Sequence, residues 1–215
     1  MTPLPSFRSR VVPVVSIDAA EQAVPLAEAL LEGGIDVIEI TLRRPGGLPG
    51  IAELSRRAIP ICVGAGTLLD ADDVKRALDA GARFGLSPGC TPALAEAALR
   101  AKLPFVPGVM TPSEVMAARA LGFRLLKLFP AAQAGGIAML RAMAGPLQDV
   151  RFIPTGGVRA DALAEWLREP NVERVGGTWI APVDLIACGD WAGISRLARE
   201  AGLIAGLRSR DGDIG

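Results

Sequence analysis

The chain of 215 residues contains no histidine and no tyrosine. The absence of histidine excludes the Ser-His-Asp and Cys-His arrangements that activate a nucleophile, and it excludes every metal site built with an imidazole ligand. It also removes the commonest general base of enzymes. If this protein is an enzyme, its proton transfers must therefore depend on carboxylates, lysine, hydroxyl groups or water.

Cysteine is scarce as well. The three cysteines, Cys62, Cys90 and Cys188, are far apart in the chain and odd in number. They match neither a zinc-binding spacing nor a disulfide framework, and such usage is typical of a reducing cytoplasm. We expect all three to have structural roles.

The chain also lacks an excess of charge of either sign, with 23 Lys and Arg against 23 Asp and Glu. Net charge therefore gives no reason to expect nucleic acid or an acidic membrane surface as a partner. No apolar run is long enough to span a membrane, and the start "MTPLPSFRSR" lacks the apolar segment of a signal peptide. These features predict a cytoplasmic protein. Its length and its 50% hydrophobic content predict a single domain over residues 1–215.

Short apolar or β-branched runs, each bounded by Gly or Pro, alternate with alanine- and leucine-rich segments of helical period. The pattern predicts strands at 11–16, 35–42, 60–66, 83–88, 104–109, 124–129, 151–156 and 174–179. The clearest helices between them are expected at 18–33, 70–81 and 91–101. Several of the helical segments open with Asp, Thr or Ser, as N-caps do, and two end in Gly.

Eight strands, each followed by a helix, predict an α/β protein with a single (β/α)8 TIM barrel over about residues 10–205. The alternative is a doubly wound open sheet. It is less favoured because no G-x-G-x-x-G follows the first strand and no P-loop motif occurs. The polar tail at 208–215 is expected to be frayed.

Alternation along the strands predicts which side chains point into the barrel. In "IDVIEITLR" (35–43) the apolar even positions suit packing against helices. The odd positions are Val37, Glu39, Thr41 and Arg43, so this strand directs a carboxylate, a hydroxyl and a guanidinium inward. In "FRLLKLFPAA" (123–132) the same alternation points Lys127 inward.

A lysine in such an apolar run has two interpretations. Lys127 and Glu39 could form a buried ion pair that only fixes packing, although such pairs add little stability. Alternatively, the apolar surroundings disfavour the ammonium ion and leave a free amine that attacks a carbonyl. We favour the second interpretation, in which Lys127 forms a Schiff base.

Glycine pairs end the last two predicted strands, in "PTGGV" (154–158) and "VGGTW" (175–179). In barrels, the loops after strands 7 and 8 often bind phosphate through backbone N–H groups, which glycine allows to approach closely. Glycine pairs also serve tight turns, but their position in this fold favours phosphate binding. "GAGT" (64–67) is a third glycine-bearing strand end, where Thr67 offers a hydroxyl to an anion.

Six motifs resemble, in order and spacing, the class I 2-keto-3-deoxy-6-phosphogluconate (KDPG) aldolases, which often also act on 4-hydroxy-2-oxoglutarate (KHG). They are "EITLR" (39–43), "GAGT" (64–67), "SPG" (87–89), "KLFPA" (127–131), "PTGG" (154–157) and "GGTW" (176–179), and the resemblance covers about residues 10–205. It implies a homotrimeric barrel that needs no metal or organic cofactor. It also implies cleavage of the phosphorylated keto acid KDPG into pyruvate and D-glyceraldehyde 3-phosphate in the Entner–Doudoroff pathway.

The resemblance assigns roles to individual residues. Lys127 is expected to be the Schiff-base lysine and Glu39 the general acid and base. The expected substrate-binding residues have four roles: Arg43 and Thr67 for the carboxylate, Pro88 and Phe129 for the walls of the pyruvyl pocket, Thr155 near a substrate hydroxyl, and Gly156, Gly157, Gly177 and Thr178 for the phosphate.

The chain departs from the family pattern at two places. Thr178 stands where many members have Ser, so an added methyl group tightens the predicted phosphate site. After Arg43, the glycines and prolines of "RPGGLPG" (44–50) are expected to delay the next helix. The alternatives that stay open are an aldolase for the C4-epimeric galactonate substrate and a barrel that binds phospho-sugars without catalysis.

Overall fold

The computed structural model describes residues 2–206, so the tail predicted to be frayed, 208–215, lies outside the described residues. Strands and helices alternate along the chain as the sequence predicts. The strands are β1 (Val11–Val15), β2 (Val37–Thr41), β3 (Cys62–Gly66), β4 (Phe84–Leu86), β5 (Phe105–Val106), β6 (Gly108–Val109), β7 (Leu125–Leu128), β8 (Arg151–Pro154) and β9 (Val175–Gly177). The helices are α1 (Ala23–Glu32), α2 (Gly47–Arg56), α3 (Ala71–Asp79), α4 (Pro92–Arg100), α5 (Pro112–Ala120), α6 (Gly136–Ala144), α7 (Leu163–Arg168), α8 (Val183–Cys188) and α9 (Trp191–Ile204), with 3-10 turns η1 (Ala20–Gln22) and η2 (Ala160–Ala162).

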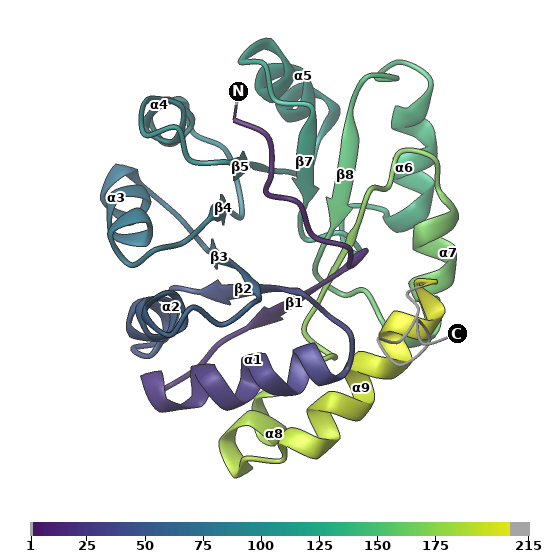
Figure 1. Ribbon diagram of the computed structural model, residues 1–215. Coiled ribbons are helices and arrows are strands. Elements are labelled where there is room, and N and C mark those ends of the chain that lie inside the picture. The colour runs from purple at the N-terminus through teal and green to yellow at the C-terminus, as the bar shows by residue number, and fades with distance from the viewer. Residues whose placement is uncertain (1, 207–215) are drawn as a thin grey trace.

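The strands form a curled parallel sheet with the helices outside it (Figure 1). The hydrogen-bonded order is β5-β4-β3-β2-β1-β9 in one part and β6-β7-β8 in the other. From β1 to β5 the spatial order follows the chain order, so this part of the sheet lacks the reversal that defines a doubly wound fold. The predicted α/β class is therefore confirmed. The strands form a curled parallel sheet, and its hydrogen-bond ladder is divided into two parts.

The ladder divides at two places, and the first has a local cause. The predicted strand 104–109 is split into β5 and β6 at Pro107, which has no N–H to donate to a neighbour. The carbonyl of Pro107 still accepts a hydrogen bond of 2.9 Å from the N–H of Lys127. Between β8 and β9 the contact is made by isolated parallel bridges, Phe152 with Val172 and Thr155 with Gly176.

The predicted helices are confirmed in place, and the structure adds their caps. Asp70 accepts a hydrogen bond from the N–H of Asp73 at the start of α3, and Thr91 accepts one from the N–H of Leu94 at the start of α4. The predicted helix 18–33 begins as the 3-10 turn η1 and continues as α1, which ends before Gly33.

The expected delay of the helix after Arg43 is wrong, because α2 begins at Gly47 and includes Pro49. A proline in the first turn of a helix costs no intrahelical hydrogen bond, since the N–H groups there have no helical partner. Gly46 and Gly47 are needed for close packing: a Cβ atom on Gly46 would lie 2.5 Å from the nitrogen of Ala19, and one on Gly47 would lie 2.6 Å from the carbonyl oxygen of Thr41.

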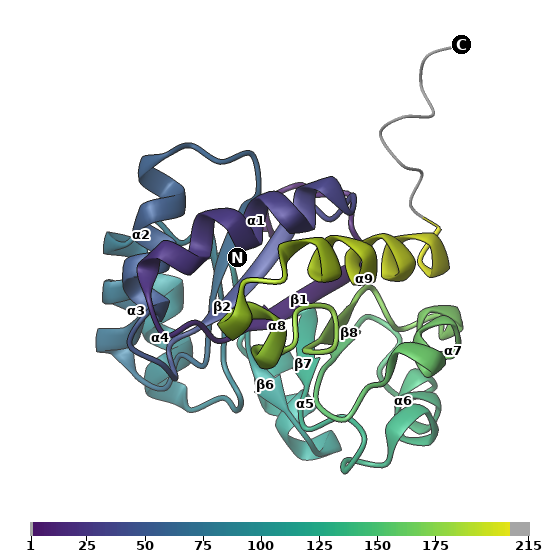
Figure 2. The same ribbon diagram turned by 90° about the horizontal axis from the view of Figure 1, so that it is seen from below.

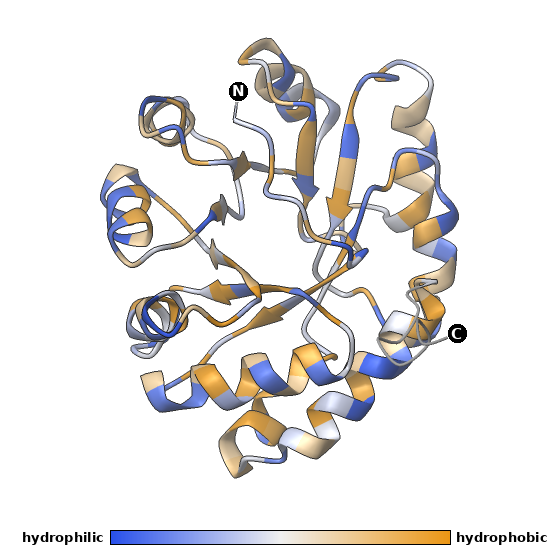
Figure 3. Ribbon diagram, in the orientation of Figure 1, coloured by the Kyte–Doolittle hydropathy of each residue, from blue (hydrophilic) through white to orange (hydrophobic). Residues whose placement is uncertain are grey.

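The core fills the space between the strands and the helices, whose apolar faces turn inward (Figure 3). Helices α1 and α9, at opposite ends of the chain, lie side by side in two views (Figures 1 and 2). Their approach is close enough that a Cβ atom on Gly33 would lie 2.4 Å from Cβ of Ala198. Across residues 2–206, none of the helices combines the length and the apolar character needed to cross a bilayer.

The segment before β1 covers the amino ends of several strands. Arg8 and Ser9 donate their backbone N–H groups to the carboxylate of Asp36, which lies just before β2. The stretch from Thr2 to Phe7 lines a surface depression together with residues at the starts of β5 and β7 and just before β9. The opposite, carboxyl ends of the strands are left to form the site described next.

Candidate active site

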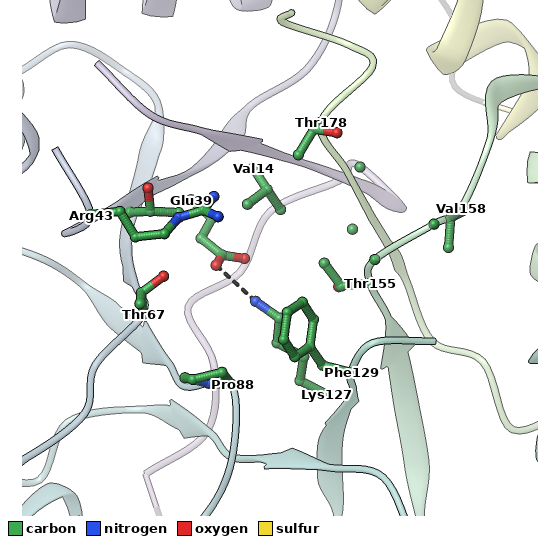
Figure 4. Close-up of a pocket in the computed structure, with 15 residues that line it drawn as sticks. Val14, Glu39, Arg43, Thr67, Pro88, Lys127, Phe129, Thr155, Val158 and Thr178 are labelled. Carbon is green, nitrogen blue, oxygen red and sulfur yellow. Dashed lines mark hydrogen bonds and ion pairs between the residues drawn. The ribbon is translucent and has the colours of Figure 1, made fainter. Parts of the chain in front are cut away.

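A cavity of about 200 Å³ lies at the carboxyl ends of the strands (Figure 4). The lining residues come from strand ends and the loops that follow them: Val14, Glu39, Thr41, Arg43, Thr67, Pro88, Lys127, Phe129, Thr155, Gly156, Gly157, Val158, Gly176, Gly177 and Thr178. Parallel strands bring their carboxyl ends to one rim, which explains how residues from distant parts of the sequence meet there.

An ion pair lies in this cavity. Nζ of Lys127 donates to Oε1 of Glu39 at 2.9 Å, although the two residues are 88 positions apart in the chain. The two side chains are 6% and 1% exposed, and the buried Oε2 of Glu39 has no hydrogen-bond partner among residues 2–206. The carboxylate thus holds the amine with one of its two oxygens. Nζ of Lys127 also lies 5.5 Å from the centre of the Phe129 ring.

Strand alternation accounts for this pair. Glu39 and Thr41 on β2 both line the cavity, and Lys127 on β7 lines it from the facing strand. The neighbours of Lys127 on β7, Leu126 and Leu128, are fully buried in the core. The structure confirms the predicted inward orientation of Glu39 and Lys127.

Arg43 also lines the cavity, but it does so for a different reason. Strand β2 ends at Thr41, so the turn that follows, rather than strand alternation, directs the Arg43 side chain. Arg43 is exposed at the mouth, with Nη2 3.4 Å from Oγ of Ser16. Arg44 turns away and pairs with Asp18 on the surface at 2.5 Å, and this hydrogen bond raises the pKa of Arg44 above its ordinary value.

The hydroxyl groups of the cavity are held by their backbones. Thr67 has a φ of 65°, a left-handed conformation that is unusual for a β-branched residue and marks a constrained position. The N–H of the next residue, Leu68, donates to the carbonyl of Leu86 and so anchors this turn to the next strand. Thr155 is buried beside Gly176, where a Cβ atom would lie 2.2 Å from Oγ1 of Thr155.

Glycines shape the far side of the cavity. Gly156 and Gly157 have φ values of 94° and 72°, conformations that other residues rarely adopt. A Cβ atom on Gly157 would lie 2.5 Å from Cβ of Ala132, and one on Gly177 would lie 1.7 Å from the ring of Trp179. Backbone conformation therefore favours glycine at Gly156 and Gly157, and lack of space requires it at Gly157 and Gly177.

All eleven residues that the sequence predicts for the site line this one cavity. Sequence reasoning did not assign site roles to four further lining residues, Val14, Thr41, Val158 and Gly176. Strand alternation points to Thr41, which shares a face with Glu39. Val14 is signalled only by tertiary structure, since it lies opposite Glu39 in the pairing of β1 with β2.

The cavity is polar at both ends. Figure 4 shows Arg43 and Thr67 on one side of the Lys127–Glu39 pair, and Thr155, Val158 and Thr178 on the other. Two cationic side chains and one carboxylate among the lining residues leave one positive charge in excess, which favours an anionic ligand. Among residues 2–206, the acidic and cysteine side chains nowhere gather in a group of three that could hold a metal ion.

Comparison with known proteins gives a consistent result. The family described as "KDPG and KHG aldolase" matches residues 7–197. The 2-dehydro-3-deoxy-phosphogluconate aldolase of Pseudomonas aeruginosa is 47% identical over 193 residues, covering 90% of this chain and 88% of the relative. The KHG/KDPG aldolase of Escherichia coli is 40% identical, covering 89% of this chain and 90% of the relative.

Solved structures agree with these sequence matches. The crystal structure of KDPG aldolase from Legionella pneumophila, with pyruvate captured as a covalent carbinolamine intermediate, superposes with a TM-score of 0.88. The two chains are 41% identical, and the match covers 90% of this chain and 94% of the other. The KDPG aldolase of Zymomonas mobilis with 3-phosphoglycerate has a TM-score of 0.85 and is 37% identical, with 94% and 93% of the chains covered.

Proposed function

The chain belongs to the KDPG and KHG aldolase family, and from this membership and the cavity we propose that it is a class I aldolase. Its substrate is 2-keto-3-deoxy-6-phosphogluconate, which it cleaves to pyruvate and D-glyceraldehyde 3-phosphate, the Entner–Doudoroff reaction. It also accepts 4-hydroxy-2-oxoglutarate, in keeping with the name of the Escherichia coli relative.

One observation carries this proposal: the buried contact of 2.9 Å between Nζ of Lys127 and Oε1 of Glu39, at the wall of an open cavity. A purely structural ion pair has no need of a cavity beside it. The amine that Schiff-base chemistry needs and a carboxylate that can carry protons therefore lie in contact beside the space for a substrate.

The two polar sides of the cavity suggest how the substrate lies. Its carboxylate would be held by Arg43 and Thr67, with Pro88 and Phe129 against the three-carbon pyruvyl part. Its phosphate would lie on the other side, at Gly156, Gly157, Gly177 and Thr178. The C2 carbonyl of the substrate then faces Lys127, which lies between the two anionic ends. The hydroxyl groups of the substrate lie near Thr155.

Cleavage then proceeds through covalent steps on Lys127. The amine adds to C2 to give a carbinolamine, and loss of water gives an iminium ion. Removal of the proton from the C4 hydroxyl breaks the C3–C4 bond, the electron pair moves to the iminium nitrogen, and D-glyceraldehyde 3-phosphate leaves. The remaining enamine takes a proton at C3, and water hydrolyses the pyruvyl iminium to release pyruvate and the free amine.

Glu39 would carry the protons in these steps. It is the carboxylate among the lining residues, and it contacts the nitrogen on which the intermediates form. As a base it accepts the C4 hydroxyl proton, directly or through water, and as an acid it returns a proton to the enamine. Acid–base transfer of this kind is worth on the order of 10²–10⁴-fold in rate.

We also propose the finer features that membership implies. The two sheets act together as one (β/α)8 barrel, for which the bridges between β8 and β9 and the single proline between β5 and β6 give support. Residues 1–215 form a single domain, and the enzyme acts in the cytoplasm as a homotrimer. Light scattering should then give about three times the chain mass of 22.3 kDa.

The trapping experiment tests the proposed chemistry. Incubation with pyruvate and borohydride should add one pyruvyl-derived group per chain, and peptide mapping should locate it on Lys127. Lys75 and Lys102 are exposed internal controls in the same reaction. Absence of an adduct, or an adduct on the exposed lysines alone, would overturn the Schiff-base assignment and favour a barrel that binds without catalysis. Cleavage rates for KDPG and its C4 epimer then decide between those two substrates.

A further inference from the structure

A short chain of hydrogen bonds lies at the carboxylate side of the cavity. Oγ of Ser16 and Oγ1 of Thr41 are 2.6 Å apart, and Nη2 of Arg43 lies 3.4 Å from Oγ of Ser16. Thr41 and Arg43 both line the cavity, whereas Ser16 is not one of the lining residues and is bonded to both of them. One serine outside the cavity is therefore bonded to two residues inside it.

The strand register explains why Ser16 lies there. Strands β1 and β2 pair in parallel, with Val14 opposite Glu39 and Val15 opposite Ile40. The next position in this register sets Ser16, one residue past the end of β1, beside Thr41. Ser16 shares alternation with Val14, which lines the cavity, so its hydroxyl is directed to the same face of the sheet.

The hydrogen bonds that join Arg43, Ser16 and Thr41 have a preferred order of donor and acceptor. A guanidinium can only donate, so Oγ of Ser16 accepts from Arg43. A hydroxyl that accepts from a cation becomes a stronger donor, which favours a bond from Ser16 to Oγ1 of Thr41. The proton of the Thr41 hydroxyl is then free to point into the cavity, toward an anionic group held by Arg43.

The loop that carries Ser16 is itself fixed to the turn that carries Arg43. Asp18 pairs with Arg44 at 2.5 Å, and Gly46 packs on the backbone of residues 17–19. The turn that follows β2 therefore rests on the loop that follows β1. An exposed arginine on such a turn would otherwise lose much conformational freedom on binding a ligand.

We infer that Ser16 is a positioning residue, which holds Arg43 and orients the Thr41 hydroxyl so that both donate to the carboxylate of the keto acid. This inference rests on the proposed function and adds Thr41 as a direct ligand of the carboxylate. It concerns binding of the keto acid rather than the bond-breaking step, so its effects should separate KM from kcat.

The test compares two ligands of the same enzyme, pyruvate and its neutral methyl ester, by the concentration that gives half-maximal borohydride trapping. Ser16→Ala and Thr41→Val should each raise this concentration for pyruvate about five- to tenfold, the scale of one lost hydrogen bond of ordinary strength. For methyl pyruvate the change should stay within about twofold, since the ester lacks the negative charge. Ser16→Thr, which keeps the hydroxyl, should restore the pyruvate value.

Ser9→Ala is the matched control. Ser9 is fully buried before the other end of β1, where its hydroxyl bonds to the carbonyl of Val11 far from the cavity. It should change neither half-saturation value by more than about twofold, whatever it does to stability.

The outcomes are distinguishable. If wild type forms no adduct, the proposed function fails and this inference fails with it. If wild type is trapped but Ser16→Ala and Thr41→Val leave pyruvate binding unchanged, or weaken both ligands equally, the positioning role alone is wrong. Weaker binding of pyruvate alone, with rescue by Ser16→Thr, supports the positioning role.

Discussion

Glu39 allows the two halves of the proposed chemistry to be separated at a single residue. Glu39→Gln keeps the shape of the side chain and an oxygen that accepts from Lys127, but it removes the group that exchanges protons. The pyruvate adduct should still form, while KDPG cleavage falls by about 10²-fold or more. Exchange of the pyruvate methyl protons with deuterated water, followed by NMR, should fall in parallel.

The control for this change is Glu53→Gln on α2, where the carboxylate pairs with Arg56 and Arg57 at the surface. It should leave cleavage and exchange near wild type. If Glu39→Gln retains cleavage, the proton carrier is a bound water or another group, and the role assigned to Glu39 is wrong.

Two adjacent arginines differ only in where they point. Arg43 lines the cavity, whereas Arg44 pairs with Asp18 at the surface. Arg43→Ala should lose about 2–3 kcal/mol of transition-state stabilisation in kcat/KM, the scale for a charged hydrogen bond to substrate. Arg44→Ala should change kcat/KM by less than about 1 kcal/mol, as is usual for an exposed ion pair. Reversed losses in steady-state kinetics would show that Arg44 binds the carboxylate.

At the scale of elements, the glycine turn after β8 should be more sensitive than glycines elsewhere. Gly157→Ala forces an alanine to a φ of 72° and brings its Cβ within 2.5 Å of Ala132, so unfolding free energy should fall by about 1–3 kcal/mol in denaturant melts. Gly145 ends α6 with φ −67°, and a Cβ atom there would meet no neighbouring atom of residues 2–206 within 4 Å. Gly145→Ala should therefore be neutral or slightly stabilising, and an equal loss in both variants would contradict the conformational argument.

At the scale of the whole molecule, Cys62 reports on global unfolding. It is buried on β3, and burial raises the pKa of its thiol to about 11, so little thiolate exists at neutral pH. Alkylation of the native protein should label the exposed Cys188 first and Cys62 only as fast as the core opens. Mass spectrometry of timed samples measures both, and early labelling of Cys62 would show that the sheet opens locally.

The sequence by itself determined the features that depend on neighbours along the chain. Periodicity predicts the alternation of strands and helices, and the alternation within "IDVIEITLR" and "RLLKLF" predicts that Glu39 and Lys127 point inward. Glycine pairs predict strand ends because the backbone conformation of a turn depends mainly on its own residues. All eleven predicted site residues line one cavity, since each is specified by its own strand and its own loop.

Only the tertiary structure decided what depends on residues far apart in the chain. The 2.9 Å contact across 88 positions, the turn that directs Arg43 after β2 has ended, and the start of α2 at Gly47 all follow from how loops and strands pack. Ser16 is the clearest case: an ordinary serine in the sequence becomes bonded to Thr41 and Arg43 because β1 and β2 pair in one particular register. Local pattern specifies which way a side chain points, but register and packing specify what it meets.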